Sequence, residues 1–128
     1  VGLVCECFGK NSVLIAEQVE PLEQVVDYLT EQMKMQSVLR LQKNESTIQH
    51  GFIVSDILNN LERVSDHCSN IAGCIIEISG HGSLLLHQYL GTVKDNDANY
   101  SLAYEEYRKK YRFLAKEAEG YDTEKQKR

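Results

Sequence analysis

Residues 54–76 read VSDILNNLERVSDHCSNIAGCII and carry the strongest helical pattern in the chain. Apolar side chains recur there at intervals of three and four residues over several turns, which is the period of an amphipathic α-helix. They are Val54, Ile57, Leu58, Leu61, Val64, Cys68, Ile71, Ala72, Ile75 and Ile76. The pattern predicts a helix over about residues 47–79, and Gly80 and Gly82 supply its stop.

Two further segments have the same period. In residues 12–42 the stripe is formed by Leu22, Val26, Leu29 and Met33, with Val25 beside it. Pro21 either kinks this segment or lies in the first turn of a new helix, because proline is unfavourable in a helix interior. In residues 98–117 the stripe is formed by Tyr100, Tyr104, Tyr107, Tyr111 and Leu114, and this spacing assigns the tyrosines to core packing.

The predicted architecture is therefore an all-α antiparallel bundle of three long helices. A short apolar piece around residues 84–90 adds another turn or two of helix. Residues 95–106 imitate a calcium-binding loop, but Tyr100 stands where that loop needs glycine, so we interpret them as a polar loop that caps the third helix. We expect one domain over residues 1–120 and a frayed polar tail at 121–128.

Composition excludes several classes of function. The chain has 128 residues, of which 42% are hydrophobic, enough for the core of one domain. Its 14 basic and 19 acidic residues give a net charge of −5, which disfavours nucleic acid as a partner. No run approaches the roughly 20 apolar residues that span a bilayer, so we expect no membrane insertion by this segment. Since the sequence starts at Val1 without Met or a signal peptide, we expect a piece of a longer protein.

The cysteines indicate a reducing compartment. Cys68 and Cys74 lie inside the second predicted helix, where reduced and buried thiols are expected. Cys5 and Cys7 flank a single residue, a spacing too short for a zinc knuckle without further ligands. The sequence therefore predicts neither a disulfide scaffold nor a thiolate metal site.

Two acidic pairs stand out at helical spacing. Glu23 and Asp27 lie four residues apart in the first predicted helix, as do Glu62 and Asp66 in the second. Each pair therefore stacks on one face of its helix. Surface acids usually have Lys or Arg three or four residues away, but only Asp66 does here, and its neighbour Arg63 either pairs with it or turns outward.

Both pairs border the apolar stripes, so two packed antiparallel helices could bring four carboxylates together at one seam. Carboxylates that close repel one another unless a metal ion supplies the missing positive charge. Oxygen ligands favour hard cations, and the predicted cofactor is a divalent or trivalent metal ion among iron, manganese, zinc and magnesium. The alternative is a solvated acidic face, because this spacing is common by chance in acidic helices.

Part of the sequence resembles a known family. Residues 58–72 read LNNLERVSDHCSNIA, which is similar to the signature of PhoU domains, a Leu-Glu-Arg-Ile-Gly-Asp-His string followed by Asn-Ile-Ala. Residues 23–27, EQVVD, lie where such domains carry a companion acidic motif. Ser65 replaces the usual glycine and Cys68 the usual alanine, and both are small enough to keep the helices close. The resemblance covers about residues 18–78.

PhoU-like domains are three-helix bundles whose paired acidic motifs hold metal clusters. The resemblance therefore implies Glu23, Asp27, Glu62 and Asp66 as metal ligands. Arg63, His67 and Asn70 are candidates for supporting positions around them, although His67 follows Asp66 directly and so points about 100° away.

The resemblance also implies a function. PhoU-like domains occur alone as phosphate-signalling regulators and fused behind the membrane part of bacterial sodium/phosphate cotransporters, and the Tyr-rich third helix is more similar to the fused kind. We expect a regulatory domain that is not an enzyme, in the cytoplasm at the inner face of the membrane. Its expected partner is the membrane part of the same chain or a phosphate-signalling protein. A homodimer is also compatible with the sequence.

Two other classes of function remain as alternatives. A carboxylate-bridged dinuclear metal enzyme could activate water or oxygen, but such enzymes normally add histidine ligands in a Glu-x-x-His spacing that these helices lack. A helical protein-interaction module without metal would leave the acids solvated. The burial of Glu23 and Glu62 would separate this module from the two metal-binding classes.

Overall fold

The computed structural model describes the backbone of residues 1–79 and 98–125, and side chains up to residue 112 within those ranges. All regular structure in these ranges is helical, which confirms the predicted all-α class. The predicted short helix around residues 84–90 and the start of the predicted polar loop at Asp95 lie outside the described residues. The rest of that predicted loop, residues 98–106, is helical, so the loop interpretation is wrong there. None of the described helices is both long and apolar enough to cross a membrane.

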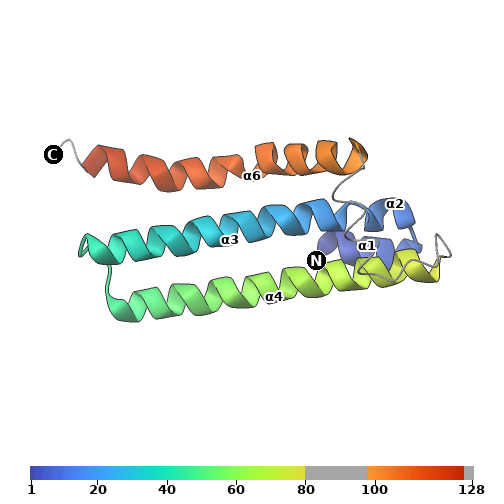
Figure 1. Cartoon of the computed structure of the whole chain (residues 1–128), viewed down its shortest axis with the longest axis horizontal. Helices are drawn as coiled ribbons and strands as arrows, with labels where there is room; N and C mark the ends of the chain where they lie inside the picture. The colour runs from blue at the N-terminus through green and yellow to red at the C-terminus, as the bar shows by residue number, and fades with distance from the viewer. Residues whose placement is uncertain (80–97, 126–128) are drawn as a thin grey trace.

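The long helices are α3 (Val19–Gln42), α4 (Ile48–Ile78) and α6 (Ala98–Lys125), and the shorter α1 (Gly2–Lys10) and α2 (Val13–Ala16) precede them. In Figure 1, α3 lies between α4 and α6, and each long helix runs antiparallel to the next along the chain. Because the direction reverses twice, α6 runs parallel to α3. The predicted bundle of three long helices is therefore correct.

The segment predicted over residues 12–42 consists of two helices rather than one. Helix α2 ends at Ala16, and α3 begins at Val19, which places Pro21 in the first turn of α3. A backbone N–H in the first turn has no partner within its helix, so proline loses nothing there. Helix α6 runs to Lys125, beyond the end near residue 117 that the tyrosine stripe indicated. The domain boundary at residue 120 stays a prediction.

Helix ends are defined by local chemistry. Thr47 is the N-cap of α4, where its hydroxyl accepts the N–H of His50 at 3.2 Å. Asn44, in the turn from α3 to α4, has a left-handed φ of 58°, and Asn11 ends α1 with a φ of 47°. Asparagine tolerates this conformation better than most residues do. The short turn that contains Asn44 makes α4 antiparallel to α3.

The best-buried core lies at one end of the bundle, where α1, α2 and the start of α3 meet the last turns of α4. Its members are Val4, Cys7, Ala16, Val19, Ala72, Ile75 and Ile76. Elsewhere the seam between α3 and α4 is closed by fewer side chains, notably Leu58, which is 2% exposed. Val25 is also 2% exposed, but it lies about half a turn of α3 away from Glu23 and Asp27.

Several apolar residues that the periodicity assigned to the core are exposed. Ile57, Leu61, Val64 and Ile71 of α4 are 43–54% exposed, and Met33 of α3 is 53% exposed. The apolar surface of α4 is wider than α3 can cover, and α6 packs on α3. The tyrosines at positions 100, 104, 107 and 111 are half-buried, in partial agreement with core packing.

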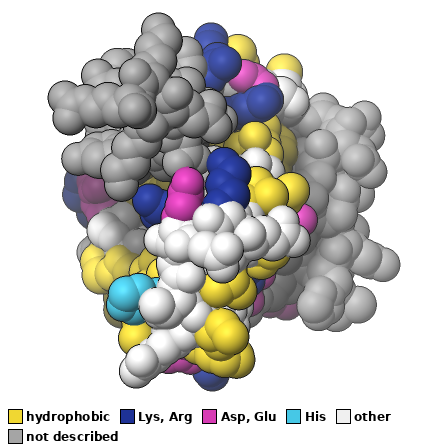
Figure 2. Space-filling view, turned by 90° about the vertical axis from the view of Figure 1, so that its left-hand side faces the viewer, with side chains coloured by type: hydrophobic (Ala, Val, Ile, Leu, Met, Phe, Trp, Pro, Cys, Tyr) yellow, Lys and Arg dark blue, Asp and Glu magenta, His cyan; other side chains and the backbone are white. Residues whose placement is uncertain are grey.

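Some of these uncovered side chains, Met33, Leu61 and Val64, border an open groove of about 350 Å³ between α3 and α4, with Leu3 and Val4 of α1 at one end. Leu22, Val26 and Leu29 line it from α3, and Leu61 and Val64 line it from α4. A second hollow of about 300 Å³ lies nearer the turn between these helices. Figure 2 views that end of the bundle, where hydrophobic side chains reach the surface among charged ones.

The cysteines follow the prediction only in part. All four are free thiols, as expected for a reducing compartment. Cys7 is buried and Cys68 half-buried, but Cys74 is exposed, against the expectation that it is buried. Its side chain lies on the outer side of α4, between the buried positions Gly73 and Ile75.

Candidate metal centre

Three of the four predicted ligands lie together at the seam of α3 and α4. Glu23 and Asp27 are one turn apart on α3, and Asp66 reaches them from α4. Each contributes a carboxylate oxygen to a group in which the oxygens lie within 4.8 Å of one another. The antiparallel packing of two helices that each carry an acid pair therefore produces a cluster of negative charge.

Burial makes this cluster electrostatically costly. Glu23 is only 7% exposed, and burial, aided by the charges of Asp27 and Glu20, raises its pKa from 4.5 to about 7. Its Oε2 accepts a hydrogen bond from Nε2 of Gln24 at 2.8 Å, which only partly opposes that shift. Burial also raises the pKa of Asp27, together with the charges of Asp66, Glu62 and Glu20. The site therefore favours either a proton or another positive charge.

One oxygen of the cluster lacks a donor. Oδ1 of Asp27 is buried, and no N–H or hydroxyl donor reaches it from the part of the chain that the structure describes. The carboxyl group of Glu23 hydrogen-bonds to the Asp27 carboxylate when Glu23 is protonated. The hydroxyl of Thr30 donates to the backbone carbonyl of Asp27 at 2.9 Å, so it does not serve the carboxylate. A buried carboxylate oxygen normally has a partner, which marks this atom as a candidate ligand.

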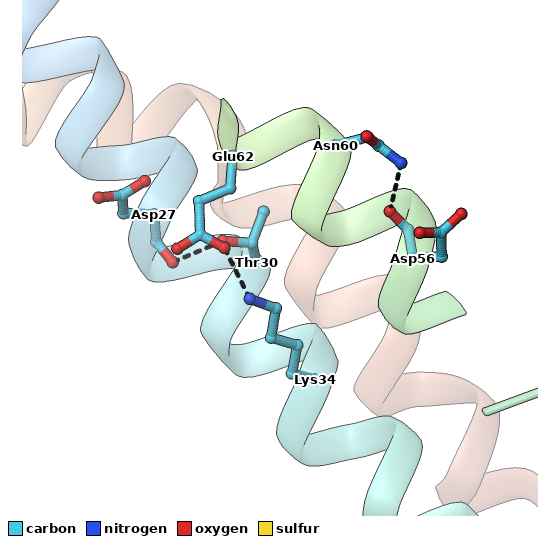
Figure 3. Close-up of polar contacts among 6 residues, drawn as sticks. All are labelled: Asp27, Thr30, Lys34, Asp56, Asn60 and Glu62. Atoms are coloured by element: carbon cyan, nitrogen blue, oxygen red, sulfur yellow. Dashed lines mark hydrogen bonds and ion pairs between the residues drawn. The ribbon is translucent and has the colours of Figure 1, made fainter. Parts of the chain in front are cut away.

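Glu62, the fourth predicted ligand, is not in the cluster. Its Oε2 lies 2.6 Å from Nζ of Lys34, a residue of α3. Figure 3 shows Glu62 reaching across from α4 to α3 near Thr30, with Asp27 on one side and Lys34 on the other. Lys34 belongs to α3 and Glu62 to α4, so the spacing of residues within one helix could not predict this ion pair.

Glu20 also belongs to this seam, and the sequence analysis did not select it. It is 7% exposed, and its carboxylate accepts a hydrogen bond from the hydroxyl of Ser69 on α4. Burial, together with the charges of Glu20 and Glu23, raises the pKa of Tyr100 on α6 to about 12. The spacing of Glu20, Glu23 and Asp27 along one face of α3 was the available signal for its position.

A comparison with known protein families identifies the family of this chain. The family model described as PhoU domain matches residues 1–75. The chain belongs to the PhoU domain family. The match contains both acidic pairs and all of α1 to α3, and it ends before the last residues of α4. Comparisons with curated proteins and with solved structures found no match.

The three predicted supporting residues of this PhoU domain lie on its surface. Arg63, His67 and Asn70 are all exposed on α4. Among the described residues, no hydrogen bond or ion pair joins them to the clustered carboxylates. Their role in supporting a metal site stays a prediction.

The donor set of the PhoU domain fits a hard cation. Glu23, Asp27 and Asp66 offer oxygen atoms only, and the buried Oδ1 of Asp27 lies within the seam. A bound cation would replace the proton that the raised pKa of Glu23 favours, so binding would release a proton near neutral pH. Because Asp66 is exposed, the cluster is open to solvent on the α4 side.

Proposed function

We propose that this PhoU domain is a metal-binding regulatory domain that takes part in the control of phosphate transport. The observation that carries the proposal is the group formed by Glu23, Asp27 and Asp66, whose oxygens lie within 4.8 Å of one another across two helices. The family supplies the link to phosphate regulation. The cluster supplies a means of responding to a cation.

The cation would act on the structure through the seam. Two ligands belong to α3 and one to α4, so a bound ion ties the helices together at a point where their charges otherwise repel. Iron, manganese, zinc and magnesium all accept carboxylate oxygens, and the hard cations among them suit an all-oxygen set best. Binding would therefore stabilise the bundle and fix the relative position of α3 and α4.

We propose further that the domain is attached to a sodium-dependent phosphate cotransporter, in the cytoplasm at the inner face of the membrane. Its partner would be the membrane part of the same chain or a phosphate-signalling protein. The open apolar groove between α3 and α4 supports contact with a protein partner. The role is regulatory rather than catalytic, because the clustered ligands are carboxylates without the Glu-x-x-His spacing of di-iron enzymes.

Metal analysis of the purified domain tests this function. Protein prepared without chelator should contain near-stoichiometric metal by inductively coupled plasma mass spectrometry, and Asp66→Asn should lose most of it. Asp56→Asn is the matched control, because Asp56 is an exposed acid of the same helix outside the cluster. Equal metal contents in both variants, or a metal-free wild type that Mn²⁺ does not stabilise, would contradict the proposal.

A further inference from the structure

The ion pair between Lys34 and Glu62 lies beside the candidate metal centre. Lys34 follows Asp27 by seven residues, two turns of α3, and therefore lies on the same side of that helix. Glu62 precedes Asp66 by one turn of α4. The Glu62 side chain thus begins next to one clustered carboxylate, and its Oε2 ends 2.6 Å from the ammonium group of Lys34.

Glu62 is also within electrostatic range of the cluster. Its charge is among those that raise the pKa of Asp27, so the two carboxylates are close enough to repel. Both partners of the ion pair are half-exposed, at 35% for the Lys34 side chain and 38% for that of Glu62. Neither side chain is locked by burial, so Glu62 has two destinations within reach, the ammonium group and the cluster.

We propose that Lys34 is an intramolecular competitor for the metal, which holds Glu62 out of the coordination sphere and thereby sets the affinity and ligand number of the site. This inference rests on the proposed function. With the ion pair intact, the chain offers three carboxylates. When Glu62 leaves Lys34, it offers four, and the affinity for a cation rises.

Lysine suits this role because of its chemistry. Its ammonium group is a compact charge on a flexible four-carbon stem, with none of the rigid two-pronged geometry that binds arginine to a carboxylate. Half-exposed ion pairs of this kind are weak, so the exchange of Glu62 between lysine and metal is reversible. The strength of such pairs corresponds to a change in metal affinity of roughly twofold to fivefold.

The test compares the Mn²⁺ affinities of Lys34→Met and Lys43→Met. Each metal-free variant is titrated with Mn²⁺ alone, and isothermal titration calorimetry measures the binding. Lys43 is an exposed lysine at the end of the same helix, so its variant removes the same charge without touching Glu62. We expect Lys34→Met to bind Mn²⁺ about twofold to fivefold more tightly than Lys43→Met does. In a Glu62→Gln background this difference should disappear, and urea unfolding shows whether each variant is folded.

The outcomes separate the two proposals. If wild type binds Mn²⁺ but the two lysine variants bind it equally well, or if the difference persists without Glu62, the competition is wrong and the metal site stands. If neither wild type nor Lys34→Met binds Mn²⁺, both proposals are overturned. Tighter binding by Lys34→Met that depends on Glu62 supports both.

Discussion

At the scale of single residues, the acids at the seam between α3 and α4 differ in the hydrogen-bond or ion-pair partner that each one finds. Glu20 accepts a hydrogen bond from Ser69, and Glu62 pairs with Lys34. Glu23 and Asp27 have no lysine or arginine among their ion-pair partners in the described part of the chain, and burial raises both their pKa values. Among the described residues, the clustered acids without a cationic partner are therefore Glu23 and Asp27, one turn apart on α3, and Asp66, which faces them from α4.

The raised pKa of Glu23 makes the stability of the metal-free domain depend on pH. Because this pKa is about 7 in the folded state against 4.5 ordinarily, the folded protein binds the proton more tightly than the unfolded chain does. The resulting stability is fully present below about pH 4.5 and is lost as pH rises through about 7. We expect Glu23 to contribute a decrease of about 3 kcal/mol in the free energy of unfolding over this range.

Urea unfolding with chelator present, at several pH values, measures this effect. Glu23→Gln should abolish most of the decrease, because the amide does not titrate. Glu31→Gln, at an exposed position of the same helix, should retain it. A pH dependence that is the same in both variants would assign the effect to other groups.

At the scale of elements, α4 has faces with different environments. Leu58 and Ala72 are buried, at 2% and 3% exposure. Asp66 meets the acids of α3 at the seam, whereas Leu61 and Val64 line the open groove. Only the buried part of this wide apolar surface contributes strongly to the stability of the fold.

Adjacent residues of α4 should therefore differ in their contribution to stability. Leu58→Ala removes a fully buried side chain and should lower the free energy of unfolding by about 2 to 4 kcal/mol. Ile57→Ala, at a position 54% exposed, should lower it by less than about 1 kcal/mol. Urea unfolding followed by circular dichroism gives both values, and a larger loss for Ile57→Ala would mean that another surface covers this face.

At the scale of the whole molecule, the order of the helices divides the bundle into a closed end and an open face. The core around Cys7 and Ile75 is closed by α1 and α2, which pack against the end of α4. Farther along, α6 packs on α3, and the apolar groove between α3 and α4 stays open. The fold thus keeps an apolar surface available to a partner.

The open groove should bind a hydrophobic dye in the native state. The fluorescence of 8-anilinonaphthalene-1-sulfonate should rise with wild-type protein and fall when Leu61 and Val64 are both changed to Gln. Because both side chains are about half exposed, stability should change by less than about 1 kcal/mol per substitution. Leu102→Gln on α6, 65% exposed and outside the groove, is the control. Unchanged fluorescence in the groove variant would place the dye elsewhere.

The three long helices, the resemblance to PhoU domains and the two acidic pairs could be predicted from the sequence, because these features are local. Periodicity along 30 residues reports a helix, and a spacing of four places Glu23 with Asp27 and Glu62 with Asp66. Of the two alternatives predicted for Pro21, a kink or a place in the first turn of a new helix, the second is correct.

Which side chains of different helices meet depends on the packing of the whole fold. The relative rotation and offset of α3 and α4 bring Asp66 to Glu23 and Asp27, whereas Glu62, one turn away, reaches Lys34. The same packing buries Glu20 against Ser69 and leaves Leu61 exposed. These contacts depend on distances between segments far apart in the chain, and the period of a single helix carries no information about them.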